Sequence, residues 1–340
     1  MFIKEIKNIL QPFRENSGYL LQNNERCAIM KPRRKLPAER GGLMKRIVFF
    51  LLINIVFCSL MSGCEKQYYE KENTQEIILI EEKTKKISFI ISTGTTLEKR
   101  IDVPEGYERV DVPEKSFADF LRSYNMKEDG SPVLLYDGSE KGNQDAHVAV
   151  FDLPVENYDL QQCADSVMRM YAEYYWHNSQ HDKIAFCFTN GFLCEYSKWK
   201  EGYRVVVDSN GARWKKSTSY DESYETFVKY LKIVFSYAGT QSMEKLESEM
   251  IPLSQLGIGD VILKGGSPGH VVMVVDMCRN DYGKKAFLLA QGYMPAQEFH
   301  VVKNPAHDND PWYYEEEFDF PLQTAEYTFG DEDMIKRLMY

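Results

Sequence analysis

The pattern of hydrophobic positions predicts a group of consecutive strands in the C-terminal half of the chain. Residues 271–275 are all apolar, which is typical of a strand buried on both faces. Apolar residues also predict strands at 260–264 and 286–291. A turn rich in Gly, Ser and Pro connects the first of these to the apolar run. The pattern therefore places His270 at the first residue of a buried strand, which we expect to span 270–278, and we expect the His270 side chain to be partly exposed there.

Apolar residues at helical spacing occur upstream of these strands. They predict a short helix at 116–124, a longer one at 160–176 with Asp159 as its N-cap, and a third at 220–237. Gly239 follows the third helix and favours a helix end at that point. Each helix has an apolar stripe that must pack on another element, and the predicted strands provide the surface for it.

Further strands complete the prediction of the fold class. Residues 133–136 and 147–153 have strand-like patterns. The stretch 293–321 is rich in Pro, Asn, Asp and aromatic residues, and we expect it to wrap the sheet as an ordered loop. Helices followed by consecutive antiparallel strands predict an α+β fold, in which helices pack on an antiparallel sheet.

A hairpin is predicted at residues 184–196 because Asn190 and Gly191 form the preferred pair for a type I′ turn. This turn would pair positions whose numbers sum to 381 and would place Cys187 opposite Cys194. The two cysteines are then either a cross-strand disulfide or two small apolar residues side by side. Both interpretations stay open at this stage.

The N-terminal part has the pattern of an export signal. Met44, Lys45 and Arg46 form a short basic start, residues 47–61 are almost entirely apolar, and the run ends at Cys64. This pattern resembles a bacterial lipoprotein signal peptide, which implies cleavage before Cys64 and a lipid on its thiol. A transmembrane anchor is the alternative, but the run falls short of the ~20 residues that a spanning helix needs.

These patterns divide the chain into five segments. Residues 1–43 are mixed, polar and basic, and we interpret them as a mis-assigned or disordered extension before a true start at Met44. A signal peptide at 44–63 and a tether at 64–86, rich in Glu, Lys and Gln, follow. Residues 87–325 are expected to form a single α+β domain, and 326–340 a C-terminal tail.

Charge and composition exclude several classes of function. Residues 1–63 hold 11 of the 41 Lys and Arg residues and 4 of the 51 Asp and Glu residues, so residues 64–340 carry a net charge of −17. Such a surface disfavours nucleic acid as a partner. The sequence has no phosphate-binding loop, no dinucleotide-binding fingerprint and no spaced Cys/His cluster. We therefore expect no cofactor and no metal site.

Cys163 and His270 are the candidate catalytic pair. A thiol near a helix N-terminus can act as a nucleophile when a His takes its proton and a polar group orients that His. Gln291 and Tyr293 are the candidates for the orienting group. The expected register places Gln291 opposite Val274, too far from the ring unless a bulge or a wider turn shifts the pairing, and it places Tyr293 closer. The alternative is that Cys163 is a core residue in an apolar stripe. His147, at another strand start, is a second candidate base.

Five phrases together resemble a family of envelope lipoproteins, the domain-of-unknown-function family 4846. The phrases lie at 160–170, 188–191, 237–240, 259–270, and 289–297 with 303–305. Gly292 departs from the family pattern, where Ser is expected. The resemblance covers most of residues 95–320 and implies the domain, but it implies no reaction. The His270 phrase alone also has a weaker, fold-level similarity to papain-like cell-wall cysteine amidases.

Two functions follow as expectations. The first is an envelope lipoprotein whose papain-like groove binds a glycan or peptide without cleaving it. The second is a thiol-dependent amidase or peptidase acting on peptidoglycan or its peptide stems, through Cys163 and His270. In both, the expected partners are a membrane, reached through lipid on Cys64, and cell-wall glycan or peptide. The expected location is the bacterial cell envelope.

Overall fold

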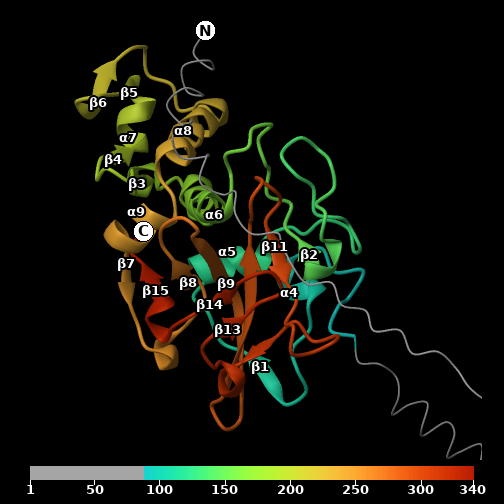
Figure 1. The fold of residues 1–340 in the computed structure, drawn as a ribbon. Coiled ribbons are helices and arrows are strands. Elements are labelled where there is room, and N and C mark those ends of the chain that lie inside the picture. Colours follow the sequence, from blue (N-terminus) through green and yellow to red (C-terminus); the bar gives the residue numbers. More distant parts are fainter. Residues whose placement is uncertain (1–87) are drawn as a thin grey trace, which may run out of the picture. The chain divides into compact units, whose positions relative to one another are not determined.

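The computed structural model describes residues 88–340 (Figure 1). The chain divides into two compact units, Met1–Thr84 and Lys85–Tyr340, and the second contains all the described residues. The predicted signal peptide, the lipid site at Cys64 and the tether lie outside the described residues. No helix in the described part is both long enough and apolar enough to span a bilayer.

A nine-stranded sheet forms the centre of the described unit. Its main path runs in the order β2-β11-β10-β9-β8-β15-β7, and β1 and β12 pair with β9 and β10 outside that path. All of the pairings are antiparallel. The strands are β1 (Tyr107–Arg109), β2 (His147–Val150), β7 (Ser248–Met250), β8 (Val261–Lys264), β9 (His270–Asn280), β10 (Lys285–Gln291), β11 (His300–Val302), β12 (Tyr313–Tyr314) and β15 (Ile335–Leu338).

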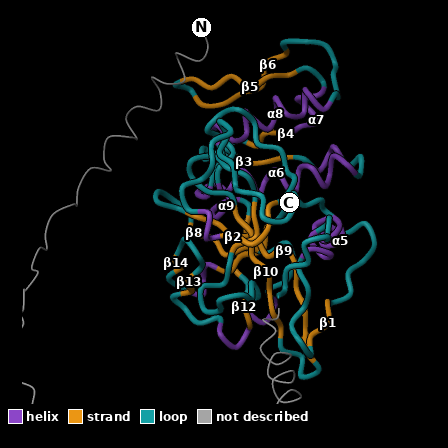
Figure 2. Tube along the Cα trace, turned by 90° about the vertical axis from the view of Figure 1, so that its right-hand side faces the viewer, coloured by secondary structure: helices purple, strands orange, loops and turns teal. Residues whose placement is uncertain are grey.

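Helices cover one face of this sheet. The helices α5 and α6 pack on β9, and α9 packs on β8, while α8 lies farther out against α6 and α7. In Figure 2, α5 and α6 lie on one side of the strands, and β13 and β14 lie on the other. The α-helices are α4 (Leu97–Arg100), α5 (Phe117–Ser123), α6 (Cys163–His177), α7 (Tyr196–Lys200), α8 (Tyr224–Tyr237) and α9 (Thr240–Leu246). The 3₁₀ helices are η3 (Gln144–Ala146), η4 (His181–Lys183), η5 (Leu253–Gln255), η6 (Glu315–Glu317) and η7 (Glu332–Met334).

The two faces of the sheet have separate hydrophobic cores. Alternating side chains of β9 contribute to both, with Val271 and Met273 packed on the helical face and Val272 on the other. The second core is closed by C-terminal residues such as Phe318 and Phe329. This double burial explains why the β9 sequence is an unbroken apolar run. The α+β class with an antiparallel sheet is confirmed.

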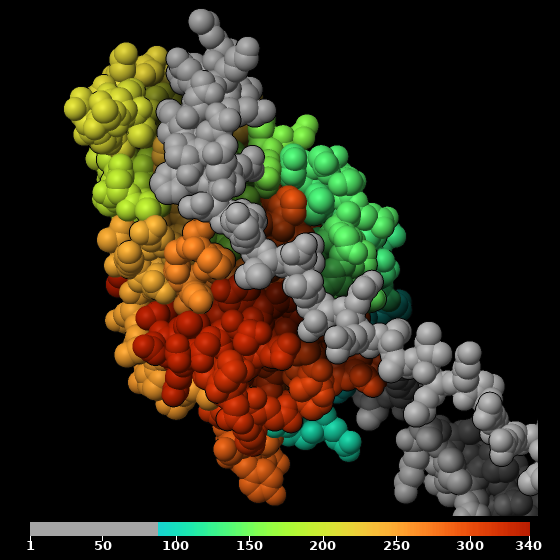
Figure 3. All heavy atoms as spheres, viewed as in Figure 1, coloured from blue at the N-terminus to red at the C-terminus, as the bar shows by residue number. Residues whose placement is uncertain are grey.

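Three small hairpins lie outside the main sheet. Their strands are β3 (Ala185–Cys187) with β4 (Leu193–Glu195), β5 (Tyr203–Asp208) with β6 (Gly211–Lys216), and β13 (Leu322–Gln323) with β14 (Thr328–Phe329). In Figure 3, the part that carries β5 and β6 projects at the upper left, in yellow. The third hairpin belongs to the C-terminal segment that covers the second core.

The register predicted for the β3–β4 hairpin is wrong by one residue. Cys187 pairs with Leu193, and Cys194 pairs with Phe186, so paired positions sum to 380 rather than 381. A shift of one residue moves a side chain to the opposite face of a hairpin. Cys194 is therefore buried, Cys187 is half-buried, and both are free thiols in this structure.

Three other predicted segments differ from the structure. Residues 133–136 form only isolated bridges, Leu134 with Glu140 and Leu135 with Gln297. The stretch 293–321, expected as loop, supplies β11, and this strand lies inside the sheet between β2 and β10. The segment 326–340, interpreted from the sequence as a tail, contributes β15 between β8 and β7.

Candidate functional site

Helix α6 begins at Cys163, three residues later than the sequence predicts. Gln162, not Asp159, is the N-cap, and its backbone N–H donates to Oδ2 of Asp165 (3.0 Å). Asp159 instead accepts from Gln162 Nε2 (3.1 Å) and from the Ala296 N–H (2.8 Å). The later start places the Cys163 thiol on the first residue of the helix, where the peptide dipoles favour negative charge.

The first turn of α6 packs tightly against the sheet. A Cβ at Gly292, one residue beyond β10, would lie 2.4 Å from Ser166 Oγ and 2.9 Å from the Gln162 carbonyl oxygen. Only glycine fits this contact without a shift of the helix. The Cys163 sulfur lies against the main chain of Val271, the residue after His270. The start of α6 therefore meets the main chain at the start of β9, whereas the side chain of His270 lies on the other face of the sheet, against Phe329.

Gln291 orients His270. The Nε2 atom of His270 lies 2.8 Å from Oε1 of Gln291. The register expected from the sequence is wrong by two residues, and it allowed this contact only if a bulge or a wider turn shifted the pairing. The pairing already differs by one residue next to the turn, where Lys285 pairs with Arg279. A β-bulge between Leu288 and Leu289 shifts it by one more, so that Leu289 pairs with Val274 and Gln291 lies toward His270.

The direction of each hydrogen bond around Gln291 is fixed by charge. Its Nε2 atom donates to Oε2 of Glu326 (2.8 Å), and the same carboxylate forms an ion pair with Lys141. An ionised carboxylate only accepts hydrogen bonds, so the amide nitrogen must face Glu326 and the amide oxygen must face His270. An amide oxygen also only accepts, so His270 carries its proton on Nε2. Nδ1 is left unprotonated as the basic atom of the ring.

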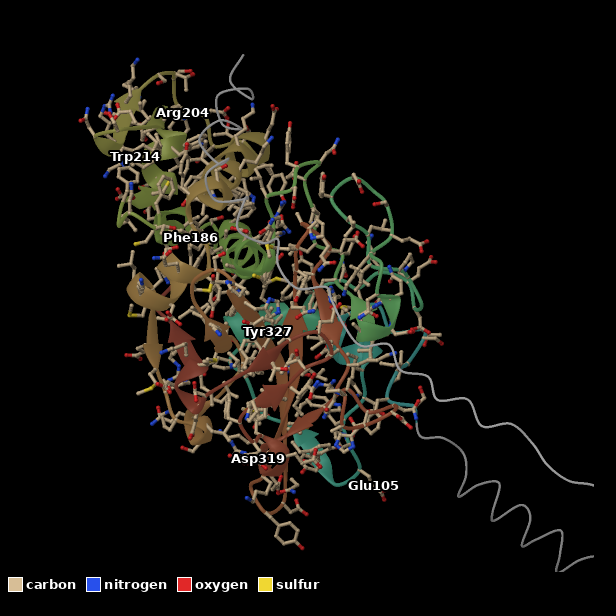
Figure 4. The ribbon with its side chains drawn as sticks, viewed as in Figure 1. Glu105, Phe186, Arg204, Trp214, Asp319 and Tyr327 are labelled. Carbon is tan, nitrogen blue, oxygen red and sulfur yellow. The ribbon has the colours of Figure 1, made fainter. Side chains whose placement is uncertain are left out.

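Aromatic side chains surround His270. Its ring centroid lies 4.8 Å from that of Tyr293, 4.7 Å from that of Tyr327 and 6.0 Å from that of Phe329. Figure 4 labels Tyr327, where the C-terminal segment crosses the sheet. His270 is 2% exposed and Cys163 is 7% exposed, whereas Tyr293 and Tyr327 are half-buried. The expectation of a partly exposed His270 is wrong, because the C-terminal segment covers the ring.

Burial sets the protonation states of the pair at rest. Desolvation lowers the pKa of His270 to about 4, against a smaller opposing effect from the Gln291 hydrogen bond. Desolvation, followed by the Asp165 carboxyl, raises the pKa of the Cys163 thiol to about 12. At neutral pH the site therefore holds a neutral thiol and a neutral imidazole, and no hydrogen bond joins the two within the described residues.

His300, Glu326 and Lys141 belong to the same network and were missed from the sequence. His300 is fully buried, donates from Nδ1 to the Glu298 carbonyl oxygen (2.8 Å) and has Nε2 at 3.4 Å from Gln291 Nε2. The strand that carries it was interpreted as loop, and Glu326 lies at the start of the presumed tail. No sequence signal links these residues, because they come together only through the sheet.

The other candidate residues are elsewhere. His147 has Nε2 at 3.2 Å from the Ser131 carbonyl oxygen, and it makes no hydrogen bond to Cys163. It lines a cavity of about 660 Å³ together with Asp129, Lys303 and Asp310. Among the described residues, no group of three or more His, Cys, Asp or Glu side chains is arranged to hold a metal ion.

Comparison with known proteins identifies the family. The sequence model of the family described as Domain of unknown function (4846) matches residues 97–337, so the chain belongs to this family. No curated protein and no solved structure matches the chain.

Proposed function

We propose that this member of family 4846 is a thiol-dependent amidase or peptidase, with Cys163 as nucleophile, His270 as general base and Gln291 as the group that orients the base. The observation that carries the proposal is the hydrogen bond from His270 Nε2–H to Gln291 Oε1 (2.8 Å), because it leaves Nδ1 free to accept a proton. The order of thiol helix, His strand and amide strand resembles that of papain-like enzymes.

The chemistry needs no other reactant than water. Sγ of Cys163 attacks the carbonyl carbon of an amide, and the thiol proton passes to Nδ1 of His270. The C–N bond then breaks, His270 returns the proton to the departing amine, and a thioester remains on Cys163. Water, deprotonated by His270, attacks the thioester and releases a carboxylic acid and the thiol. A neutral imidazole at rest suits a base that accepts the proton only during attack.

The start of α6 supplies a place for the negative charge of the tetrahedral intermediate. The backbone N–H groups of Cys163 and Ala164, the first two residues of the helix, have no backbone acceptor within the described residues and are directed at the Cys163 thiol, where they oppose the rise of its pKa. Free N–H groups at a helix N-terminus are donors for an oxyanion. Both belong to the nucleophile or its neighbour and so lie beside the reacting carbon.

The substrate class follows from the proposed location. A lipid on Cys64 would hold the domain at the cell envelope, where the abundant amide polymer is the peptide part of the cell wall. The half-buried rings of Tyr293 and Tyr327 beside His270 offer flat apolar walls with polar edges, which suit a peptide or a sugar ring. We therefore propose peptide stems of peptidoglycan as the substrate.

The test is hydrolysis of purified peptidoglycan fragments by the full chain, followed by mass spectrometry of the products. Cys163→Ala and His270→Gln should each reduce the rate by roughly 10³-fold or more. Cys194→Ala is the matched control, since it removes another buried thiol, and it should retain the activity of the parent protein. Undiminished hydrolysis by Cys163→Ala would refute the thiol mechanism.

A groove that binds without cleavage is the second candidate. The burial of Cys163 and the rise of its pKa to about 12 favour it, because a reactive cysteine usually has a lowered pKa. In that case peptidoglycan fragments bind to the chain and are recovered intact, and Cys163→Ala binds them as tightly as the parent protein does.

A further inference from the structure

Polar side chains form a continuous row across the sheet at the site. His270 on β9, Gln291 on β10 and His300 on β11 lie on the face covered by the C-terminal segment, and Glu326 of that segment completes the row. Lys141, from the loop before β2, closes it through its ion pair with Glu326. A buried row of this kind is stable only if every donor meets an acceptor.

The Gln291 amide by itself does not determine the state of His270. If the amide turned by half a turn about its last bond, its nitrogen would face His270. The ring would then accept a hydrogen bond at Nε2 and carry its proton on Nδ1. In that tautomer Nδ1 is not a base, and the proposed proton transfer from Cys163 is blocked. The two amide orientations therefore correspond to an active and an inactive imidazole.

Glu326 selects between these orientations. Its Oε2 atom accepts from Gln291 Nε2 (2.8 Å), and an amide oxygen in the same place would face a carboxylate with no hydrogen between them. His300 acts in the same direction. Because its Nδ1 donates to the Glu298 carbonyl oxygen (2.8 Å), its Nε2 is free to accept from the second amide hydrogen of Gln291, at 3.4 Å. Lys141 forms an ion pair with the same carboxylate.

We infer that Glu326 is a positioning residue that fixes the Gln291 amide, and through it holds His270 in the tautomer with the proton on Nε2. The inference rests on the proposed function for its purpose, since the tautomer matters only if Nδ1 accepts the proton of Cys163. The tautomer itself is a property of the folded chain that can be measured without any substrate.

The experiment compares the full chain with three variants. Glu326→Gln replaces the carboxylate with an amide that can either donate or accept, so Gln291 keeps just the weaker preference set by His300 Nε2, at 3.4 Å. This single change would leave Lys141 buried without a partner, so it is made together with Lys141→Met. Lys141→Met alone keeps the acceptor, and Glu316→Gln, at an exposed glutamate of η6, is the matched control.

The first readout is the ¹⁵N resonances of the histidine rings at neutral pH, with those of His270 assigned from their loss in His270→Gln. The parent chain, Lys141→Met and Glu316→Gln should each show His270 protonated on Nε2 only. The double variant should show a mixture of the two tautomers. Retention of the single tautomer in the double variant would overturn the inference, as would a parent chain protonated on Nδ1.

The second readout is the rate of alkylation of Cys163 by iodoacetamide, followed by mass spectrometry. It should fall by about tenfold in the double variant, less than the loss caused by a direct change of the orienting group in a catalytic triad. If the tautomers behave as predicted but His270→Gln leaves the alkylation rate unchanged, the positioning role stands and the proposed function fails. If Cys163 depends on His270 but the tautomer ignores Glu326, only the positioning role fails.

Discussion

Two buried polar groups on strand β9, His270 at its start and Asp276 near its other end, show different uses of burial. Asp276 is fully buried and has charged partners on both oxygens. Oδ1 accepts from Arg122 Nε (2.7 Å) and Oδ2 from Arg109 Nε (2.7 Å). His270 is almost as buried, but among the described residues its ring has a hydrogen bond only to the neutral Gln291, and its second nitrogen has no partner there.

The bulge in β9 separates these two groups onto opposite faces. A regular strand would place both side chains on the same face, because their numbers differ by six. Instead, Leu288 of β10 pairs with Asp276 and the next residue, Leu289, pairs with Val274. Val275 is therefore the extra residue of the bulge. Asp276 therefore faces α5, which carries Arg122, while His270 faces the C-terminal segment. One end of the strand binds a helix to the sheet, and the other holds an unpaired basic nitrogen.

The difference teaches how to distinguish a structural polar group from a candidate for function. A group whose hydrogen-bonding capacity is fully used by opposite charges, as in Asp276, can do little but hold elements together. A group that keeps one oriented atom without a partner among the described residues, as His270 keeps Nδ1, can still accept a hydrogen bond or a proton in the folded state. Substitutions at the two positions should therefore have unequal effects on the free energy of unfolding.

The largest expected effect is on stability, at the Asp276 end. Asp276→Ala leaves two guanidinium groups beside an apolar cavity without their anion, and it should destabilise the fold by about 3–5 kcal/mol. Urea unfolding followed by circular dichroism measures this loss. Asp281→Asn, at an exposed carboxylate of the β9–β10 turn, is the control and should lie within about 0.5 kcal/mol of the parent protein. A small effect of Asp276→Ala would show that the ion pairs contribute little.

The sequence predicted this architecture where periodicity is strong and missed it where tertiary contacts decide. The apolar runs that form β9 and β10 and the stripe of α6 were sufficient to predict that the start of α6 packs at the start of β9. The bulge at Val275 leaves no mark in an all-apolar run, so the sequence could not place Gln291 beside His270. Sequence reasoning selected both residues of that hydrogen bond but not the contact itself.

The short strands of the C-terminal part were missed for a different reason. β11 and β15 have three and four residues, too few for a periodic pattern, and each is a strand only because it adds to a sheet that exists already. Glu326 was missed with them, because a carboxylate in a presumed tail gives no sign of a buried partner. The site thus depends on two kinds of residue, and only those on long elements could be found in advance.

A smaller effect is expected at the His270 end, in the pH dependence of stability. Burial lowers the pKa of His270 to about 4 from its ordinary value of 6.5, so below pH 6.5 the unfolded chain binds a proton that the folded chain does not. This stability is complete above about pH 6.5 and is lost as the pH falls toward 4, by on the order of 3 kcal/mol. His270→Gln should flatten the loss over this window.

The measurement is a series of urea unfolding curves from neutral pH to about pH 4, for the parent protein and His270→Gln. Burial also lowers the pKa values of His147 and His300, so the variant should keep part of the slope. Identical slopes for the parent protein and His270→Gln would contradict the neutral, buried state assigned to His270.

The smallest expected effect is at Asp165, a second buried aspartate that sharpens the contrast with Asp276. No cation accompanies Asp165, and its Oδ1 atom has no hydrogen-bond partner within the described residues. Burial therefore raises its pKa to about 8, and at neutral pH it keeps its proton. Only above about pH 8 does it become an anion beside Cys163, where its charge adds to the effect of burial and raises the pKa of the thiol further.

Asp165→Asn keeps an oxygen to accept from the Gln162 N–H and removes this charge. We expect equal rates of iodoacetamide alkylation of Cys163 for the two proteins at neutral pH. Above about pH 8 the variant should react faster, by less than about tenfold, because the desolvation of the thiol is the larger cause and remains. A difference already present at neutral pH would mean that Asp165 is ionised there, and that a buried carboxylate at this end of the sheet can hold its charge without the guanidinium partners that Asp276 has.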